Sequence, residues 1–413
     1  MRRFDVSRAV RAACVALCAP FMFQAAWAQG LSLDAALSMA LAHHPDLRAS
    51  MLEREASEGA TQQAGAWQNP ELSTLVEDTR QATRTTTIQL NQPIELGGKR
   101  SARVNAARAA QGQAELDVAA RRAQVRSQVM AAFYGVAVAQ ERVRLSAELG
   151  RLASQAREAA SKRVLAGKVS PVEELKAQVA EAQALSANAV AQSEWRAAGS
   201  QLRQALGDPS AKFERVEVDI GRLPAAGQWE PLSQRLEASP GIARAQQEIA
   251  RRQALSDLER ARRIPDLTLT LGAKRDQQLG RDQPIVGVSL VLPLFDRNQG
   301  AILEASRRED KARAEFDALR ASLEAQAVQA LSQLTSALTQ AQTLRDKVLP
   351  AARQAFAAST KGYELGKFGF LDVLDAQRTL FDAETQALSA AAQAHQADAR
   401  LLELLGEPTP TKD

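Results

Sequence analysis

Acidic side chains are the residues of this chain best placed for chemistry. Asp372 and Asp375 lie three residues apart where a helix is expected, so their carboxylates share one face of that helix. Such a pair either complements the positive end of the helix macrodipole or presents a cation-attracting face to a passage. Other acidic neighbours, such as Glu173 and Glu174, stand at expected helix starts, where they are ordinary. No arrangement of a nucleophile and a base stands out, so no enzyme activity and no cofactor are predicted.

The three histidines are His43, His44 and His395. Side chains at His43 and His44 diverge by roughly 100° around a helix, and no cysteine or third histidine lies near them in the sequence. Helix-surface histidines therefore explain the pair better than a metal site, and no metal ligand is assigned. Gly97–Lys99 is not a phosphate-binding loop, because the upstream glycine and the following Ser or Thr are missing.

Residues 1–28 are predicted to be a signal peptide. A cationic start is followed by an apolar run from Ala12 to Ala26, and Ala26-Trp27-Ala28 is a typical small-x-small cleavage site. Cys14 and Cys18 lack the flanking residues of an acylated cysteine, so no lipid anchor is expected. A core helix is the alternative interpretation, but the order of charge, apolar run and small residues favours export.

Removing this leader changes the composition. The full chain has 52 basic and 48 acidic residues. The leader holds four basic residues and one acidic residue, so the mature chain has 48 basic and 47 acidic residues. This near balance gives no support to nucleic-acid binding. Both cysteines also leave with the leader, so the mature chain can form no disulfide or thiolate metal site. A cysteine-free chain suits an oxidising periplasm.

No later segment has the composition of a transmembrane helix. The longest uncharged run, Ala325 to Leu344, contains five glutamines besides several Ser and Thr residues. A spanning helix needs about 20 mainly apolar residues. If the exported chain crosses a membrane, it must therefore do so with strands in a closed barrel.

The mature chain contains an internal duplication with a spacing of 195 to 200 residues. Its landmarks are His44-Pro45 and Ser239-Pro240, Pro70 and Pro265, Pro93 and Pro293, Gly167-Lys168 and Gly366-Lys367, and Gly207-Asp208 and Gly406-Glu407. This period is much longer than that of solenoid repeats. Two similar repeats are therefore predicted, at 29–207 and 239–406, with a linker or mid-shaft module at 208–238 and a C-terminal tail at 407–413.

Each repeat is predicted to start with a helix, the first from Ser32 to about Gly65, and to continue with a strand pair, at 72–92 and 267–292. In the second pair, aliphatic residues alternate with Thr, Gly or Ser. This alternation is typical of a membrane barrel strand with one face toward lipid, and a small soluble hairpin is the alternative. The first pair is less regular, because Glu77 and Asp78 interrupt its alternation.

Very long helices follow, at 98–206 and 299–405. The proline-free run from Lys99 to Ala166 would extend on the order of 100 Å as a helix. Its counterpart is interrupted only by Pro350. Aromatic residues make up 4% of the chain, so a bulky globular core is not expected, whereas alanine at the apolar positions suits closely packed coiled coils. The predicted fold is mostly α with a small β part.

Matched turns reverse the direction of the long helices. Gly167–Lys168 ends the first helix, and Ser170–Glu173 begins the return helix as a capping box with Pro at its first position. Gly366–Lys367 is the counterpart in the second repeat. There Gly369 is expected to cap the return helix, and Asp372 to take the position of the capping-box glutamate.

Two strand pairs give four strands per chain, which are too few to close a membrane barrel, since about eight are needed. Open strand edges in lipid are prohibitive, so membrane insertion requires oligomerisation. Three copies would supply twelve strands, and their helices would continue the barrel as a tube.

Two segments resemble a known family. Gln92–Arg100, with the sequence QPIELGGKR, resembles the CzcC-like cobalt-zinc-cadmium resistance branch of the TolC-type outer membrane efflux proteins. Tyr363–Gln377 resembles the second periplasmic turn of that family. The resemblance covers essentially the whole mature chain.

The resemblance implies a homotrimeric α-barrel in the periplasm, capped by a 12-stranded transmembrane β-barrel in the cell outer membrane. The implied partners are a periplasmic adaptor, an inner-membrane pump of the proton-driven RND type and outer-membrane lipid, with no nucleic acid. The implied function is the passage of substrates, heavy-metal cations in this branch, from the pump to the exterior.

The resemblance also assigns residues to sites. The adaptor-contacting tips are Gly167, Lys168, Ser170, Gly366, Lys367 and Gly369. The periplasmic gate comprises Asp372, Asp375 and Tyr363, and in a trimer the two aspartates would place six carboxylates around a narrow opening. Phe368 stands where some members carry an arginine gate partner, and Lys367 is the candidate to replace that arginine.

Three alternative functions remain at this point. A drug-efflux or type I secretion channel of the same family would share every feature above, because the channel passes what its pump loads. A soluble periplasmic coiled-coil adaptor would not require two proline-bounded strand pairs at matching positions. An exported enzyme is disfavoured, because long alanine-rich helices leave no pocket-forming core.

Overall fold

The computed structural model describes residues 30–406, so the predicted signal peptide and the C-terminal tail lie outside the described residues. The chain divides into two compact units. Unit 1 contains the described residues up to Pro45 together with 124–227 and 329–403, and unit 2 contains 46–123, 228–328 and the residues from Leu404 on. The longest helix, α3 (Lys99–Leu165), contributes to both units.

The first helical stretch is divided into two helices. α1 (Leu33–His43) begins at Ser32, whose hydroxyl accepts a hydrogen bond from the Ala35 amide at 3.2 Å. α2 (Pro45–Gly65) starts anew after His44, which has extended backbone. The prediction of one continuous helix is therefore wrong, because Pro45 has no N–H to donate and is better placed at a first helical position than inside a helix.

The corresponding helix of the second half, α6 (Pro240–Arg262), begins with the same chemistry. Ser239 accepts a hydrogen bond from the Ile242 amide at 3.4 Å, and Pro240 occupies the first helical position. In front of it, the segment between the two halves forms a short helix, α5 (Trp229–Glu237).

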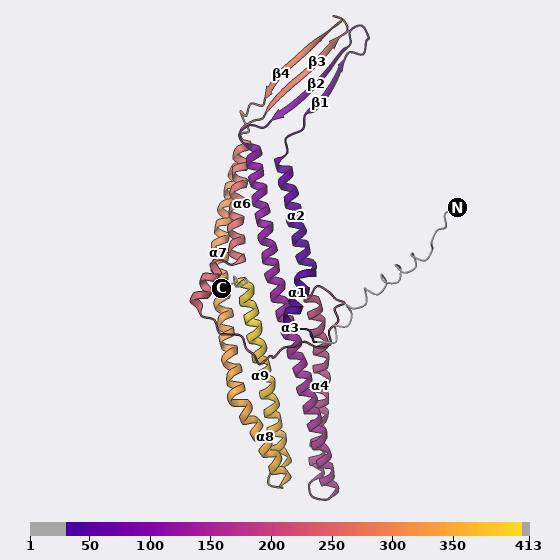
Figure 1. Ribbon diagram of the computed structural model, residues 1–413, viewed down its shortest axis with the longest axis vertical. Helices are drawn as coiled ribbons and strands as arrows, with labels where there is room; N and C mark the ends of the chain where they lie inside the picture. The colour runs from indigo at the N-terminus through magenta and orange to yellow at the C-terminus, as the bar shows by residue number, and fades with distance from the viewer. Residues whose placement is uncertain (1–29, 407–413) are drawn as a thin grey trace, which may run out of the picture. The chain divides into compact units, whose positions relative to one another are not determined.

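Four strands form one antiparallel sheet in unit 2, in the order β1-β2-β3-β4 (Figure 1). They are β1 (Glu71–Glu77), β2 (Thr85–Ile94), β3 (Leu267–Asp276) and β4 (Arg281–Leu290). Leu90 of β2 pairs with Leu271 of β3, so the two hairpins share one continuous hydrogen-bonded ladder. Both predicted strand pairs are present, and Glu77 ends β1 where the alternation fails, because Asp78 turns the chain with φ 63°.

After α3, the return helix of the first half is α4 (Pro171–Ala205). In the second half, the long helical run consists of α7 (Gln299–Thr343), a π-helical turn η1 (Leu344–Val348) and α8 (Leu349–Glu364). Its return helix is α9 (Phe370–Leu405). The π-turn lies directly before Pro350, whose missing N–H disrupts the regular α-helical ladder. Among the helices of residues 30–406, none combines the length and apolar character needed to cross a membrane.

Small residues line the buried face of the long helices. On α4, Ala177, Ala184 and Ala191 are buried at intervals of seven residues. A seven-residue repeat of small apolar side chains is the pattern of closely packed coiled coils. The predicted use of alanine for helix packing is therefore confirmed in this helix.

The main core of unit 1 surrounds Phe133 of α3, which is fully buried, and includes Leu202 and Leu206 from the end of α4. The segment between the halves joins this core through Val216. The side-chain amide of Gln140 binds both backbone groups of Val216: the Val216 N–H donates to Oε1 at 2.7 Å, and Nε2 donates to the Val216 carbonyl at 3.2 Å. Residues before α5 are therefore packed against the helices.

Candidate functional site

The two helix turns of unit 1 have the same backbone geometry. Gly167 and Gly366 both adopt left-handed backbone, with φ 66° and 69°. In the first turn the Lys168 amide donates to the Arg163 carbonyl at 2.9 Å, and in the second the Lys367 amide donates to the Gly362 carbonyl at 2.8 Å. These are the six-to-one hydrogen bonds of Schellman motifs, which require a residue tolerant of positive φ. The predicted matched turns are present.

Tyr363 lies one turn before the second tip, and Arg163 from α3 covers it. The Arg163 guanidinium lies 3.9 Å from the Tyr363 ring centroid, and its Nη2 donates to the Tyr363 carbonyl at 3.0 Å. The Tyr363 ring also packs against Phe370, with 5.7 Å between the ring centroids. Arg163 therefore connects the α3–α4 turn with the α8–α9 turn. Sequence reasoning missed this residue.

The hydroxyl of Tyr363 is buried and has no hydrogen-bond partner among the described residues. The contacts of Tyr363 within this chain are therefore made by its ring and its backbone carbonyl. A cation over an aromatic face contributes about 0.5–2 kcal/mol. The Tyr363 hydroxyl is thus a buried polar group that the described residues leave unsatisfied.

The residues after Gly366 differ in their contacts. The Phe368 ring lies directly against Gly362, where any side chain would collide with it. Phe368 therefore fills space at the turn by apolar packing. Lys367, the candidate to replace a gate arginine, forms no ion pair with any residue of the described range 30–406, and its backbone N–H makes the hydrogen bond of the turn.

Asp372 and Asp375 both lie in the first two turns of α9. The Asp372 carboxylate accepts a hydrogen bond from the Gly369 amide at 2.8 Å, which is the reciprocal half of a capping box. The predicted capping pair of Gly369 and Asp372 is therefore confirmed. In the first tip the expected box is incomplete: Ser170 accepts from the Val172 amide at 3.3 Å, but a Glu173 carboxylate oxygen is buried without a partner.

Asp375 lies beside an apolar groove between α4 and α9. The groove has a volume of about 480 Å³ and is lined by Val172, Leu175, Lys176, Val179, Leu371, Leu374, Asp375 and Arg378. The aliphatic lining residues Val172, Leu175 and Leu371 are more than half exposed. Two basic residues, Lys176 and Arg378, line the same groove as Asp375. The tips thus combine exposed aliphatic residues with charged residues of both signs.

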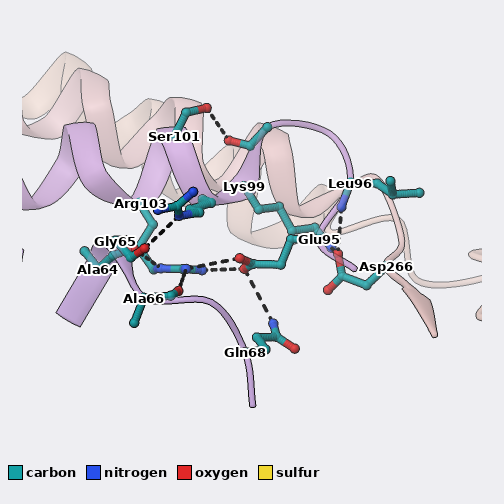
Figure 2. A network of polar contacts seen from close by, with 12 residues as sticks. Ala64, Gly65, Ala66, Gln68, Glu95, Leu96, Lys99, Ser101, Arg103 and Asp266 are labelled. Carbon is teal, nitrogen blue, oxygen red and sulfur yellow. Dashed lines mark hydrogen bonds and ion pairs between the residues drawn. The ribbon is translucent and has the colours of Figure 1, made fainter. Parts of the chain in front are cut away.

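The motif at residues 92–100 forms a second polar site, in unit 2, where the strands meet the helices (Figure 2). Arg103 donates through Nη1 and Nη2 to the two carboxylate oxygens of Glu95, at 2.5 and 3.1 Å. It also donates to the carbonyls of Ala64, in the last turn of α2, and of Ala66, just beyond that helix, at 2.8 and 3.1 Å. Arg103 holds the pKa of the Glu95 carboxyl below its usual value by this hydrogen bonding.

A second ion pair at this junction connects the two halves of the chain. Lys99 donates to Asp266 at 2.7 Å, and the Leu96 amide donates to the same oxygen at 3.2 Å (Figure 2). Gly97 adopts left-handed backbone with φ 69°, and a side chain there would collide with Ile264. Residues 95–103 therefore fix how the strands leave the helices of unit 2.

The histidines do not form a cluster. His395 is buried in unit 1, where its ring stacks on Tyr134 at 3.8 Å and its Nε2 lies 3.4 Å from the Ile220 carbonyl. His43 is the exposed last residue of α1, as predicted, whereas His44 follows the helix with extended backbone and is buried, so the predicted helix-surface position is wrong for His44. Within residues 30–406, no group of three or more His, Cys, Asp or Glu side chains is arranged to hold a metal ion.

The sequence matches the family model described as "Outer membrane efflux protein" over residues 36–208 and again over residues 232–407. Among curated proteins, it is 46% identical to the cobalt-zinc-cadmium resistance protein CzcC of Cupriavidus metallidurans, over 91% of this chain and 90% of CzcC. It is 29% identical to the nickel-cobalt-cadmium resistance protein NccC of Alcaligenes xylosoxydans xylosoxydans, over 73% of this chain and 69% of NccC.

Solved structures share the fold. The transmembrane channel protein CusC superposes with a TM-score of 0.77 at 20% identity, covering 91% of this chain and 92% of CusC. The outer-membrane channel OprN superposes with a TM-score of 0.78 at 18% identity, covering 91% of this chain and 90% of OprN. Matches to both halves of the chain and a relative at 46% identity establish its family. The chain belongs to the outer membrane efflux protein family.

Proposed function

We propose that this outer membrane efflux channel passes heavy-metal cations to the cell exterior. The observation that carries the proposal is the 46% identity to the cobalt-zinc-cadmium resistance protein CzcC, which extends over nearly the full length of both chains. NccC, whose name also specifies divalent metals, is a further relative. We propose that the cations arrive from an inner-membrane pump of the proton-driven RND type through a periplasmic adaptor.

The proposed active form is a homotrimer. One chain contributes four strands, whereas about eight are needed to close a barrel around a lumen. Three copies would supply twelve strands in the outer membrane, and their long helices would form the tunnel through the periplasm. The chain itself is proposed to catalyse no reaction, since the role of its family is transport and energy would come from the pump.

The tips of unit 1 are proposed as the periplasmic end of the channel. Exposed aliphatic residues flank both Schellman turns, and we propose that the adaptor contacts these turns at Gly167, Lys168, Ser170, Gly366, Lys367 and Gly369. Tyr363, Asp372 and Asp375 are the proposed gate residues. Asp372 already serves as a helix cap, so its proposed second role is to add charge to an acidic ring, which attracts cations.

Deletion of the gene tests the proposed cargo. We expect the deletion strain to accumulate more zinc, cobalt or cadmium than the parent strain, as measured by mass spectrometry of washed cells, and to tolerate less of these metals. Wild-type protein supplied from a plasmid should restore both properties. Unchanged metal content together with increased drug sensitivity would contradict the metal cargo and support drug efflux, and loss of a secreted protein would instead support type I secretion.

A further inference from the structure

The sheet of unit 2 has two open edges. β1 and β4 are the outer strands, and each is paired on one side only. Their outward-facing N–H and C=O groups have no strand partner among residues 30–406. Neighbouring strands alternate in direction through the sheet, so β4 of one copy is antiparallel to β1 of the next when copies are placed side by side. A closed ring of copies therefore continues the antiparallel pattern without interruption.

The two edges carry exposed apolar segments at the same end of the sheet. Trp67 precedes β1, and the segment 292–295, with the sequence LPLF, follows β4. The pairing of Leu267 with both Ile94 and Leu290 shows that β1 begins at the end of the sheet where β4 finishes. Trp67 is 66% exposed and Phe295 is 93% exposed, although both are large aromatic side chains.

The two segments also differ in their charges. On the β1 side, the Arg100 guanidinium lies 4.7 Å from the Trp67 ring centroid, so this aromatic residue carries a cation on one face. On the β4 side, the acidic residue Asp296 follows Phe295 directly. The anion Asp296 is complementary to the cation Arg100 when the segments meet, while Arg297, whose Nε donates to the Pro293 carbonyl at 3.3 Å, adds a cation on the β4 side.

We propose that the 292–295 segment of one copy packs against Trp67 of the next copy, below the strand pair formed by β4 and β1. This inference rests on the homotrimer of the proposed function and specifies its contact. Pairing of β4 with β1 brings the residues that follow one strand next to those that precede the other. Phe295 and Leu294 then cover Trp67, and Asp296 approaches Arg100. The same contact occurs three times in a closed ring.

A second copy fits these segments better than lipid does. Lipid alone would leave the hydrogen-bonding groups of both edge strands unsatisfied, at a cost of several kcal/mol each. Pairing between copies satisfies them, and it places the aromatic segments in contact without further rearrangement. Asp296, Arg297 and Gln68 are the polar neighbours of the two aromatic residues in the sequence and would supply the polar rim of such an interface.

Disulfide formation between copies tests this contact. The only cysteines of the sequence are Cys14 and Cys18, both within the predicted leader, so introduced cysteines report without background. The doubly substituted protein Trp67→Cys/Phe295→Cys, oxidised in outer-membrane vesicles, should migrate as a covalent trimer under non-reducing conditions, and a short bismaleimide should give the same product. Each single variant should give no covalent trimer.

The matched control is Trp67→Cys/Leu279→Cys. Leu279 is also exposed, but it lies in the turn between β3 and β4, at the opposite end of strands roughly 30 Å long. This pair should give no covalent trimer. Amine crosslinking of the wild-type protein, run in parallel, reports the assembly independently: absence of a trimer there would overturn the homotrimer itself. A trimer in which Trp67→Cys/Phe295→Cys fails to link, or in which Phe295→Cys reacts instead with a lipid-soluble maleimide, would overturn the proposed contact alone.

Discussion

At the residue scale, Arg163 and Tyr363 form the contact that connects the two helix turns of unit 1. Arg163→Gln removes the cation over the ring and the charge-assisted hydrogen bond, and should weaken this connection by about 1–3 kcal/mol. If the contact helps to keep the periplasmic end closed, cells producing the variant should become sensitive to a large antibiotic that cannot cross the intact outer membrane. Growth inhibition at increasing antibiotic concentrations measures this.

Arg151→Gln is the control for this prediction. Arg151 lies on the same helix and is exposed, and its Nη1 donates to the Gln155 side-chain oxygen at 3.5 Å. Its substitution should leave antibiotic sensitivity unchanged. Equal sensitivity in the Arg163→Gln strain, the Arg151→Gln strain and the wild type, at equal protein levels, would show that Arg163 has no part in closing the channel.

Glu95 is the most enclosed charged group at the strand–helix junction, with 5% of its side chain exposed. Glu95→Gln should destabilise the protein by about 1.5–3 kcal/mol, because Arg103 loses its charged partner. Glu58→Gln removes a carboxylate that is half exposed and 3.9 Å from Arg54, so its effect should stay below about 0.5 kcal/mol. The midpoint temperatures of thermal unfolding in detergent compare the two variants. Similar midpoints for Glu95→Gln and Glu58→Gln would contradict the assigned role of Glu95.

His395 should make stability depend on pH. Burial lowers the pKa of His395, although the Ile220 carbonyl partly opposes this. Tyr134 stacks on the His395 ring, and Asp398, whose pKa is raised by burial, lies on the same helix as His395 and interacts with Tyr134. The unfolded chain therefore takes up the histidine proton first, so stability falls as pH decreases below about 6.5, the ordinary histidine value.

His395→Phe tests this assignment. Phenylalanine keeps a ring against Tyr134 but cannot be protonated. The decrease in melting temperature between about pH 7.5 and 5.5 should therefore be smaller in His395→Phe than in the wild type. An identical decrease in both proteins would assign the pH dependence to other groups.

The site residues differ in how far the sequence predicts them. Gly167, Gly366 and the capping pair of Gly369 and Asp372 are predictable, because each belongs to a local pattern within six residues. Arg163 is not, since its contact with Tyr363 spans 200 residues and depends on how the helices pack. The residues around Arg163 in the sequence do not distinguish it from the other basic residues of the same helix.

At the scale of elements, the two Schellman turns depend on backbone that only glycine adopts easily. No atom lies within 4 Å of a side chain built at Gly167 or Gly366, so replacement by alanine tests backbone strain alone. Gly167→Ala and Gly366→Ala should each destabilise unit 1 by about 1–2 kcal/mol. Gly59→Ala, at an equally open position inside α2, should instead stabilise by about 0.5–1 kcal/mol. Thermal unfolding shows whether each change raises or lowers stability. Stabilisation by all three changes would contradict backbone strain at the turns.

The strands and long helices follow from the sequence more closely than the breaks between them. Alternation predicts β3 and β4, and proline-free composition predicts α3. The sequence pattern does not distinguish the effects of two prolines. Pro45 begins a new helix, whereas Pro350 follows a π-turn within one long helical run. Proline spacing alone does not specify whether a helix ends or continues through a π-turn.

At the scale of the whole molecule, the account rests on family membership and on the four-stranded sheet. The sequence predicts both, since the duplication, the strand pairs and the motifs are all readable from residue order. We propose that the assembled protein conducts ions and selects cations at Asp372 and Asp375. Conduction belongs to the assembly, because one chain provides too few strands to surround a lumen.

The most direct test is the current through the purified protein in a planar lipid bilayer with different salt concentrations on its two sides. We expect discrete openings, more frequent for Arg163→Gln, with a reversal potential on the cation-selective side. Asp372→Asn/Asp375→Asn should move that potential toward zero. If membrane-inserted wild-type and Arg163→Gln trimers both pass no current, or if cation selectivity is unchanged without the two aspartates, the account of the channel and its gate is contradicted.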